Sequence, residues 1–170
     1  MNLRPAVRAD LDAVLPLLLQ LADNGHHVDI RYRLRGHRRA LLRAHVLESW
    51  FGRFMPFPSC WVAEKDDTIV GMVSGEPLQM HAVLDQPPTV VITDLWIEPG
   101  FRRRGLARSL VDRFCRTAEE AGYPRVEVST LARDAQALAF WRAMGFADLR
   151  IALSREAEEP SDEPKADDAT

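Results

Sequence analysis

The chain has 170 residues, of which 46% are hydrophobic and 28% are charged, and its net charge is −3. This composition is ordinary for a soluble globular protein and excludes disordered and fibrous classes. No apolar run reaches 18 residues, and the start lacks the charged and apolar regions of a secretory signal, so neither a membrane span nor secretion is expected. We therefore expect a cytoplasmic protein with one core.

The last part of the chain differs in composition from the rest. Residues 156–170 carry seven acidic side chains, one lysine and two prolines, but no large apolar residue. Such a segment cannot bury enough apolar surface to offset its ordering entropy, so we expect a domain at 1–155 followed by an acidic disordered tail. Since the tail carries a charge of −6, the domain carries +3.

The first half of the chain predicts one strand, two helices and a hairpin. A strand is expected at 3–8, followed by a helix with Asp10 as its N-cap, kinked or restarted at Pro16 and stopped by Asn24-Gly25. Apolar spacing predicts a second helix at 36–54. Strands are expected at 60–64 and 69–75, joined by a turn, and a loop follows at 77–89.

The second half alternates strands and helices. Strands are predicted at 90–97, 125–130 and 146–153, with helices at 104–121 and 134–144 between them. The resulting order, β-α-α-β-β-β-α-β-α-β, implies an α/β (α+β) fold with a mixed sheet and helices on both faces. The unit at 90–130 should be a right-handed parallel crossover.

One segment has the layout of an anion site. The apolar run ending at Ile97 breaks into a loop containing Arg102, Arg103, Arg104 and Gly105, and this loop opens directly into a helix. The free N–H groups and the dipole of a helix start favour a phosphate group, and Gly105 lets the backbone approach it closely. The signatures of a P-loop and of a dinucleotide fold are both absent. Taken alone, the loop fits an ordinary polar helix start equally well.

Two sequence blocks resemble a known family. Arg102-x-x-Gly105-x-Ala107 resembles the Q/R-x-x-G-x-G/A acetyl-CoA signature of the GNAT (N-acetyltransferase) superfamily. The stretch 134–146 looks like that family's N-x-x-A-x-x-[LF]-Y-x-x-x-G-F helix, and the start of the chain is similar to its first strand and capped helix. The resemblance covers about residues 2–155. It implies a mostly antiparallel twisted sheet whose fourth and fifth strands splay apart around the acyl-bearing arm of acetyl-CoA.

The resemblance also implies how acetyl-CoA binds. Backbone groups of Leu95 and Ile97 should hydrogen-bond the pantetheine arm, and N–H groups from Arg102 to Ala107 should hold the pyrophosphate. The residues expected at the cofactor are Leu95, Trp96, Ile97, Arg102, Arg103, Arg104, Gly105, Leu106, Ala107, Arg108, Asp134 and Trp141. The five histidines lack metal-ligand spacing, so no metal site is expected.

Acyl transfer to an amine needs a group that accepts the amine proton. Strand alternation should place Asp94, Trp96 and Glu98 on one face, so the two acids are the catalytic candidates. Asp94 falls where many family members have an acid. It is expected either to accept the proton or to bind the amine as a counter-ion. For Glu98, the alternative to a catalytic role is that of an exposed acid in a turn next to a proline.

Two residues depart from the family pattern. Asp134 replaces the usual Asn and can still cap its helix, whereas Trp141 replaces the Tyr proposed to protonate the leaving thiolate. An indole N–H cannot serve as that acid, so a packing role is expected for Trp141. Cys60 and Cys115 are expected to be buried thiols, without a neighbouring base that would make either a nucleophile.

The first interpretation is an acetyl-CoA-dependent N-acetyltransferase that acetylates a primary amine of a small molecule or peptide by direct attack in a ternary complex. The alternative is a non-catalytic acyl-CoA-binding or sensing module, for which Trp141 is the supporting feature. The basic cluster at 31–43 would suit nucleic acid, but a solvated helix face is favoured because no nucleic-acid motif accompanies it. The sequence identifies neither the acceptor substrate nor the oligomeric state, for which a homodimer is one possibility.

Overall fold

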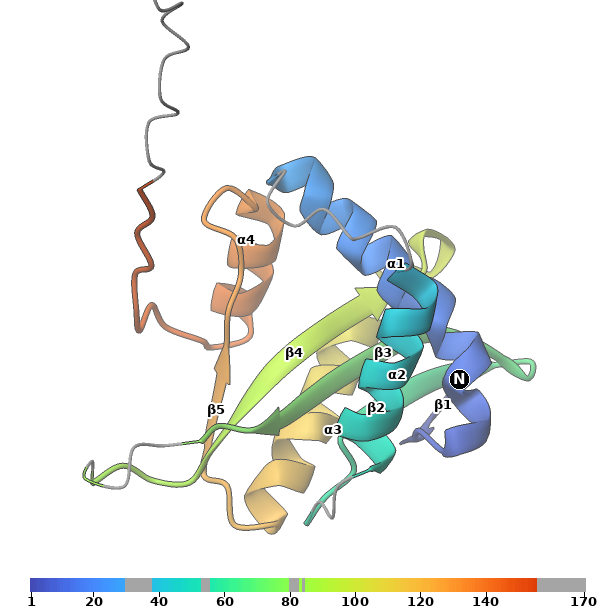
Figure 1. Cartoon of the computed structure of the whole chain (residues 1–170), viewed down its shortest axis with the longest axis horizontal. Coiled ribbons are helices and arrows are strands. Elements are labelled where there is room, and N and C mark those ends of the chain that lie inside the picture. Colours follow the sequence, from blue (N-terminus) through green and yellow to red (C-terminus); the bar gives the residue numbers. More distant parts are fainter. Residues whose placement is uncertain (30–37, 53–55, 80–82, 84, 156–170) are drawn as a thin grey trace, which may run out of the picture.

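A five-stranded sheet organises the molecule (Figure 1). The computed structural model describes residues 1–29, 38–52, 56–79, 83 and 85–155. The strands follow the order β1-β2-β3-β4-β5, and only the β4–β5 pair is parallel. Their bounds are β1 Asn2–Pro5, β2 Cys60–Lys65, β3 Thr68–Pro77, β4 Thr89–Ile97 and β5 Arg125–Val128. The expected mixed, mostly antiparallel sheet is confirmed.

Helices cover both faces of the sheet, as predicted. Their bounds are α1 Leu11–Val28, α2 Arg38–Phe51, α3 Leu106–Glu120 and α4 Ala135–Ala143, with 3-10 turns η1 Arg8–Asp10 and η3 Pro99–Phe101. Neighbouring residues of β3 show the division, because successive strand side chains point to opposite faces. Met72 packs in the cluster formed by α1 and α2, whereas Val73 packs in the cluster that includes Phe114 of α3. The hydrophobic core therefore consists of two layers, one on each face of the sheet.

The β2–β3 hairpin is confirmed and closes tightly. Asp66 and Asp67 form its turn with φ values of 49° and 58°. Two successive left-handed residues are typical of the type I′ turn, whose twist matches that of paired strands. β3 continues two residues beyond the predicted end, to Pro77.

Two predictions about the N-terminal region are wrong, namely where the first strand ends and where the following helix ends. The first strand ends at Pro5 rather than at residue 8. Asp10 is the N-cap residue of α1, as predicted, but its side chain makes no capping hydrogen bond to that helix; its carboxylate accepts a hydrogen bond of 2.8 Å from the Val7 amide at the start of η1. α1 runs unbroken through Pro16 and past Asn24-Gly25 to Val28. A glycine within a helix costs only about 1 kcal/mol, which the buried face of α1 offsets.

The predicted strand at 146–153 is also wrong. This stretch follows α4 without forming a strand, and within the described residues β5 remains the edge of the sheet. The alternation of apolar and polar residues led to the prediction, but a strand also needs a hydrogen-bonded neighbour, which no described strand supplies. The tail at 156–170 lies outside the described residues, so its disorder stays a prediction.

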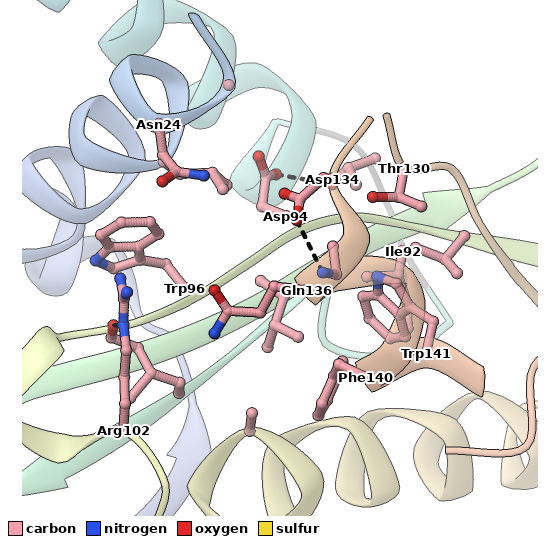
Figure 2. A pocket seen from close by; sticks show the side chains of 18 of the residues that line it. Asn24, Ile92, Asp94, Trp96, Arg102, Thr130, Asp134, Gln136, Phe140 and Trp141 are labelled. Atoms are coloured by element: carbon pink, nitrogen blue, oxygen red, sulfur yellow. Dashed lines mark hydrogen bonds between the residues drawn. The ribbon is translucent and has the colours of Figure 1, made fainter. Parts of the chain in front are cut away.

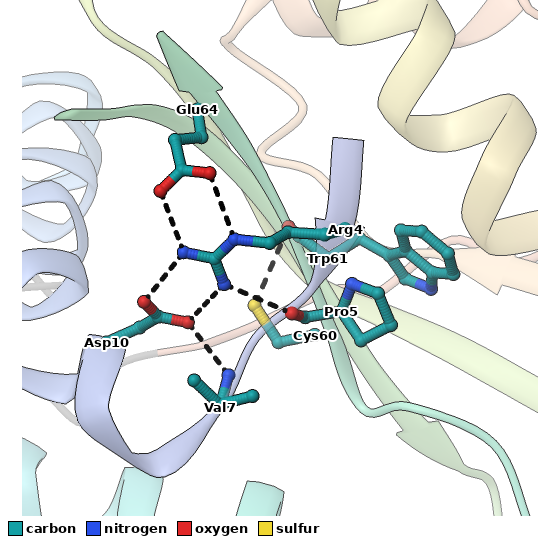
Figure 3. A network of polar contacts seen from close by, with 7 residues as sticks. All are labelled: Arg4, Pro5, Val7, Asp10, Cys60, Trp61 and Glu64. Atoms are coloured by element: carbon teal, nitrogen blue, oxygen red, sulfur yellow. Dashed lines mark hydrogen bonds and ion pairs between the residues drawn. The ribbon is translucent and has the colours of Figure 1, made fainter. Parts of the chain in front are cut away.

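An ion-pair network fastens the N-terminus to the sheet (Figure 3). The Arg4 guanidinium donates two hydrogen bonds to Asp10, at 2.7 and 2.9 Å, and two to Glu64 of β2, both at 3.1 Å. Hydrogen bonds from Arg4, and then the Val7 amide, lower the pKa of Asp10. Arg4 likewise lowers the pKa of Glu64. The network joins β1, η1 and β2.

Asp10→Asn is expected to lower the free energy of unfolding by about 1.5–3 kcal/mol at pH 7, the range for hydrogen bonds to charged groups. The Asp10 pKa is depressed in the folded state, so its stabilisation is present above the unfolded pKa of about 3.9 and is lost as the pH falls through the folded value. Urea unfolding of the wild type and the variant should therefore converge below about pH 4. Asp12→Asn, which changes a 72% exposed carboxylate, is the control, and its expected effect is below about 1 kcal/mol. A pH-independent gap for Asp10→Asn would contradict the prediction.

Candidate functional site

The site begins where β4 and β5 part. The two strands pair from Thr89↔Arg125 to Ile92↔Val128, after which β5 ends and β4 continues to Ile97. A pocket of about 980 Å³ occupies this divergence, with walls from α1, β4, the start of α3, the end of β5 and α4. The splayed strands implied by the family resemblance are therefore observed.

Most of the sequence-predicted site residues line this one pocket. The lining includes Asp94, Leu95, Trp96, Ile97, Arg102, Arg103, Gly105, Leu106, Ala107, Arg108, Asp134 and Trp141. Glu98 and Arg104 are not part of it. Glu98 accepts a hydrogen bond of 2.8 Å from Gln20 of α1, and its amide bonds the carbonyl of Val70. The structure thus brings together the expected cofactor loop and Asp94, but it separates the two candidate acids.

A β-bulge sets the position of Asp94. Ser74 pairs with Asp94 and Gly75 with Ile92, which leaves Thr93 as an extra residue in β4. Adjacent strand residues ordinarily point to opposite faces, yet here the Thr93 hydroxyl donates to Asp94 Oδ2 at 2.8 Å. The fully buried Ser74 donates to the same oxygen at 2.6 Å. Both hydrogen bonds that described residues make to this carboxylate end on Oδ2, so Oδ1 remains available in the pocket.

The loop before α3 has the backbone shape of an anion cradle. Arg103 and Gly105 have positive φ values of 61° and 77°, on either side of Arg104. Such alternation of backbone conformation turns successive N–H groups toward one point. The first helical hydrogen bond runs from the Ser109 amide to the Gly105 carbonyl at 3.0 Å. The N–H groups of the preceding turn therefore have no partner within the helix. A Cβ built on Gly105 would meet no atom within 4 Å, which means that the space above it is open.

The arginines around the cradle are partly engaged elsewhere. Arg102 Nε donates to the Ile97 carbonyl at 2.8 Å, and its guanidinium lies 4.5 Å from the centroid of the Trp96 ring. Figure 2 shows Arg102 and Trp96 side by side. Arg108 donates to the Ala143 carbonyl at the end of α4 at 3.2 Å. Arg104 lies over the ring of Phe101. These side chains supply positive charge near the loop. The Ile97 carbonyl already accepts the hydrogen bond from Arg102.

Asp134 and Trp141 have structural roles in α4. Asp134 Oδ1 accepts a hydrogen bond of 2.9 Å from the Ala137 amide, so the predicted N-cap is confirmed. Trp141 is 8% exposed and packs edge-on against Phe140 and Phe146, with ring centroids 5.0 and 5.2 Å away. The expected packing role of Trp141 is confirmed, although one side of it reaches the pocket.

Sequence reasoning missed the wall opposite β4. The C-terminal half of α1 contributes Leu18, Leu21, Ala22, Asn24 and Gly25, and α4 contributes Gln136. Figure 2 shows Asn24, Trp96 and Gln136 reaching toward the same space from three elements. Trp96 Nε1 is buried without a hydrogen-bond partner among the described residues. All of these α1 residues lie at or before the expected stop at Asn24-Gly25, so the wall does not depend on the extension of the helix to Val28.

The other sequence candidates lie away from the pocket. Cys60 is buried, and burial raises the pKa of its thiol; Cys115 is half-buried, and burial followed by the charge of Asp112 raises its pKa to about 11. Neither thiol is activated as a nucleophile. The described residues contain no group of three or more His, Cys, Asp or Glu side chains placed to hold a metal. None of the described helices is long and apolar enough to cross a membrane.

The basic cluster is only partly described. Arg31, Arg33 and Arg35 lie outside the described residues, whereas Arg43 of α2 forms an ion pair with Asp12 of α1. Arg43 therefore has a protein partner on the surface of the helix pair.

The chain belongs to the acetyltransferase (GNAT) family, whose model matches residues 27–146. It is 32% identical over 89 residues to human N-acetyltransferase 8, an alignment that spans 52% of this chain and 38% of that protein. Two solved structures share the fold. A CoA complex of the aminoglycoside N-acetyltransferase AAC(6')-Iy has a TM-score of 0.72 at 19% identity, covering 91% of this chain and 93% of that one. The 6'-N-acetyltransferase AAC(6')-IG from Acinetobacter haemolyticus has a TM-score of 0.67 at 17% identity, covering 94% and 100%.

Proposed function

We propose that the chain is an acetyl-CoA-dependent N-acetyltransferase that acetylates a primary amine by direct attack within a ternary complex. One observation carries the proposal: a single pocket contains both the cradle before α3 and the half-free carboxylate of Asp94. Family membership and the CoA complex of AAC(6')-Iy support the choice of cofactor.

The residues present fit the phosphate and pantetheine parts of acetyl-CoA. The N–H groups from Arg103 to Ala107 suit the pyrophosphate, because the loop points them outward over the open space at Gly105. Beyond Ile92, the edge of β4 that faces away from β3 has no strand partner in the described chain, so the backbone groups on that edge can pair with the extended pantetheine arm. When bound, the cofactor supplies an acetyl group as a thioester.

Asp94 acts on the acceptor. An ammonium group is unreactive until it loses a proton, and a carboxylate that holds the amine can accept that proton directly or through water. Ser74 and Thr93 fix Oδ2, so Oδ1 faces the acceptor. The amine nitrogen then bonds to the acetyl carbon, the carbon–sulfur bond breaks, and CoA leaves as a thiolate. Trp141 contributes no proton, because an indole N–H does not ionise usefully near neutral pH. A CoA thiolate can leave without an acid.

The shape of the pocket bears on the acceptor. The wall from α1 is largely apolar and carries the polar Asn24, opposite Asp94 and Gln136. A small amine or a peptide amino group with an apolar portion suits this arrangement. The AAC(6')-Iy neighbour is also known in a complex with a CoA-linked monomethyl-acetylneamine bisubstrate analogue, which supports an open, acceptor-accepting cleft in this fold.

The test is a CoA-release assay with acetyl-CoA and a panel of amines, polyamines, aminoglycosides, amino acids and peptides, with acetylated product identified by mass spectrometry. Release that depends on one acceptor class supports the proposal and names the class. Tight CoA binding without turnover on any acceptor would overturn it in favour of an acyl-CoA sensing module.

A further inference from the structure

The side chain of Arg102 lies over the opposite face of the sheet from α3, the helix that its loop opens. α3 packs in the core cluster on one face, whereas Trp96 packs against the cluster formed by α1 and α2 on the other. The Arg102 guanidinium lies 4.5 Å from the centroid of the Trp96 ring, and Nε donates to the Ile97 carbonyl at 2.8 Å. These two contacts hold the cation on the face that α1 covers.

The Arg102 cation has hydrogen-bond donors left for a ligand. The Ile97 carbonyl takes Nε, and among the described residues neither terminal nitrogen has a hydrogen-bond or ion-pair partner. A planar guanidinium held against an aromatic ring presents its terminal nitrogens as a fork that fits a carboxylate. Because Arg102 lines the pocket, an anionic group bound to this fork would belong to a ligand of the pocket.

Asp94 and the Arg102 cation are spaced to hold the two ends of one small molecule. β4 pairs regularly with β3 from Asp94 to Trp96, so both side chains project toward α1. Alternate residues of a strand lie about 7 Å apart. Two hydrogen bonds of about 2.9 Å, with the N–Cα–C unit of an amino acid between them, span a similar length. Figure 2 shows Asp94, and Arg102 with Trp96, around the same pocket.

The wall on this face suits an apolar group. Leu18 and Leu21 of α1 and Leu42 of α2 line the pocket. The residues that α1 contributes include no carboxylate, so a second ammonium group on the acceptor would lose water there without gaining a counter-ion. An uncharged side chain, in contrast, is stabilised by burial against the leucines.

We propose that the acceptor is an amino acid with an apolar side chain, whose amine is held by Asp94 and whose carboxylate is bound by Arg102. The inference rests on the proposed function and narrows it. It assigns the Arg102 side chain to the acceptor, while the N–H groups of the loop serve the pyrophosphate. The transfer step is unchanged: one proton of the ammonium goes to Asp94 before attack, and the second passes to water as the amide forms and CoA leaves as a thiolate.

Matched acceptors test the class. Leucine, phenylalanine and tryptophan are each compared in the CoA-release assay with 3-methylbutylamine, 2-phenylethylamine and tryptamine, the amines that lack the carboxylate. We expect at least one amino acid to have a kcat/KM about 10-fold or more above that of its amine. Equal or faster acetylation of the amines, or activity with polyamines or aminoglycosides alone, would overturn the inference and keep the proposed function. Acetylation of none of these acceptors would overturn the proposed function itself.

Arg102→Met tests the residue. It should lower kcat/KM for the best amino acid about 10- to 100-fold, as for a lost hydrogen bond to a charged group, and mainly through KM. The value for the matched amine and the Kd for CoA should stay within a few-fold. Arg102→Lys keeps the charge without the fork, so it should recover part of the loss. Arg116→Met removes the same charge from an exposed position of α3 outside the pocket and should change neither acceptor. Weaker CoA binding with an equal loss on both acceptors would assign Arg102 to the phosphates and refute the inference.

Discussion

Asp94→Asn is expected to lower kcat on the best acceptor by about 10²-fold or more, within the range for a lost acid–base group. The substitution keeps the shape of the side chain but removes the charge that, in the proposed mechanism, attracts and deprotonates the ammonium. The Kd for CoA, measured by calorimetry, should stay within a few-fold, because the cradle lies on a separate part of the pocket. In the wild type the rate should rise with pH as the acceptor amine loses its proton.

Glu98→Gln is the matched control. Both residues are acids near the end of β4, but Glu98 lies outside the pocket and bonds Gln20. We expect its turnover to remain within a few-fold of the wild type. The reverse result, with turnover lost in Glu98→Gln and kept in Asp94→Asn, would assign proton acceptance to Glu98. Full turnover in both variants would indicate that the proton passes directly to water.

Gly105→Glu is expected to abolish the thermal stabilisation by CoA. A ligand at a hundred times its Kd stabilises a native protein by about 2.7 kcal/mol, which for a chain of this size raises Tm by roughly 5–10 °C. The new carboxylate would occupy the open space above the loop and repel the pyrophosphate. Differential scanning fluorimetry with and without CoA measures the shift.

Two controls separate charge from backbone strain. Gly105→Ala keeps the strained φ of 77° without adding charge, so it should lower the basal Tm but retain part of the CoA shift. Gly100→Glu places the same charge on η3, where a Cβ also meets no atom within 4 Å but the residue does not line the pocket. It should keep the full shift. A full shift in Gly105→Glu would show that the phosphates bind elsewhere.

The features that the sequence predicts well are those set by local patterns. The β2–β3 hairpin follows from alternating strands around Asp66-Asp67, and α3 follows from its regular apolar spacing behind Gly105. The Asp134 cap could be predicted because it needs only the Asp134 side chain and the backbone amide of the residue three positions later, Ala137. The cofactor loop was recognised in the same way, since its residues are contiguous in the chain.

The features that were missed depend on partners distant in the sequence. The bulge at Thr93 arises from the pairing of β4 with β3, and it brings Ser74 to Asp94, twenty residues away. Ser74 carries only a weak signal in the sequence, as a hydroxyl side chain within an apolar strand. Strand alternation placed Glu98 beside Asp94, but β4 ends at Ile97. The strand predicted at 146–153 fits its local pattern and lacks a neighbour, which no local pattern can reveal.

The parting of β4 from β5 has a consequence for how the pocket tolerates mutation. Beyond Ile92, the surface that β4 offers to an extended ligand arm is polypeptide backbone, as is the cradle at the start of α3. Backbone groups are the same whichever side chain they carry. Replacing Leu95 with another apolar residue should therefore change cofactor affinity far less than would a proline, which removes an N–H and alters the path of the strand. Apart from Gly105, the cofactor side of the pocket should therefore tolerate changes of side chain, whereas changes of acceptor preference are expected at the residues of α1 and α4 that line the pocket with Asp94.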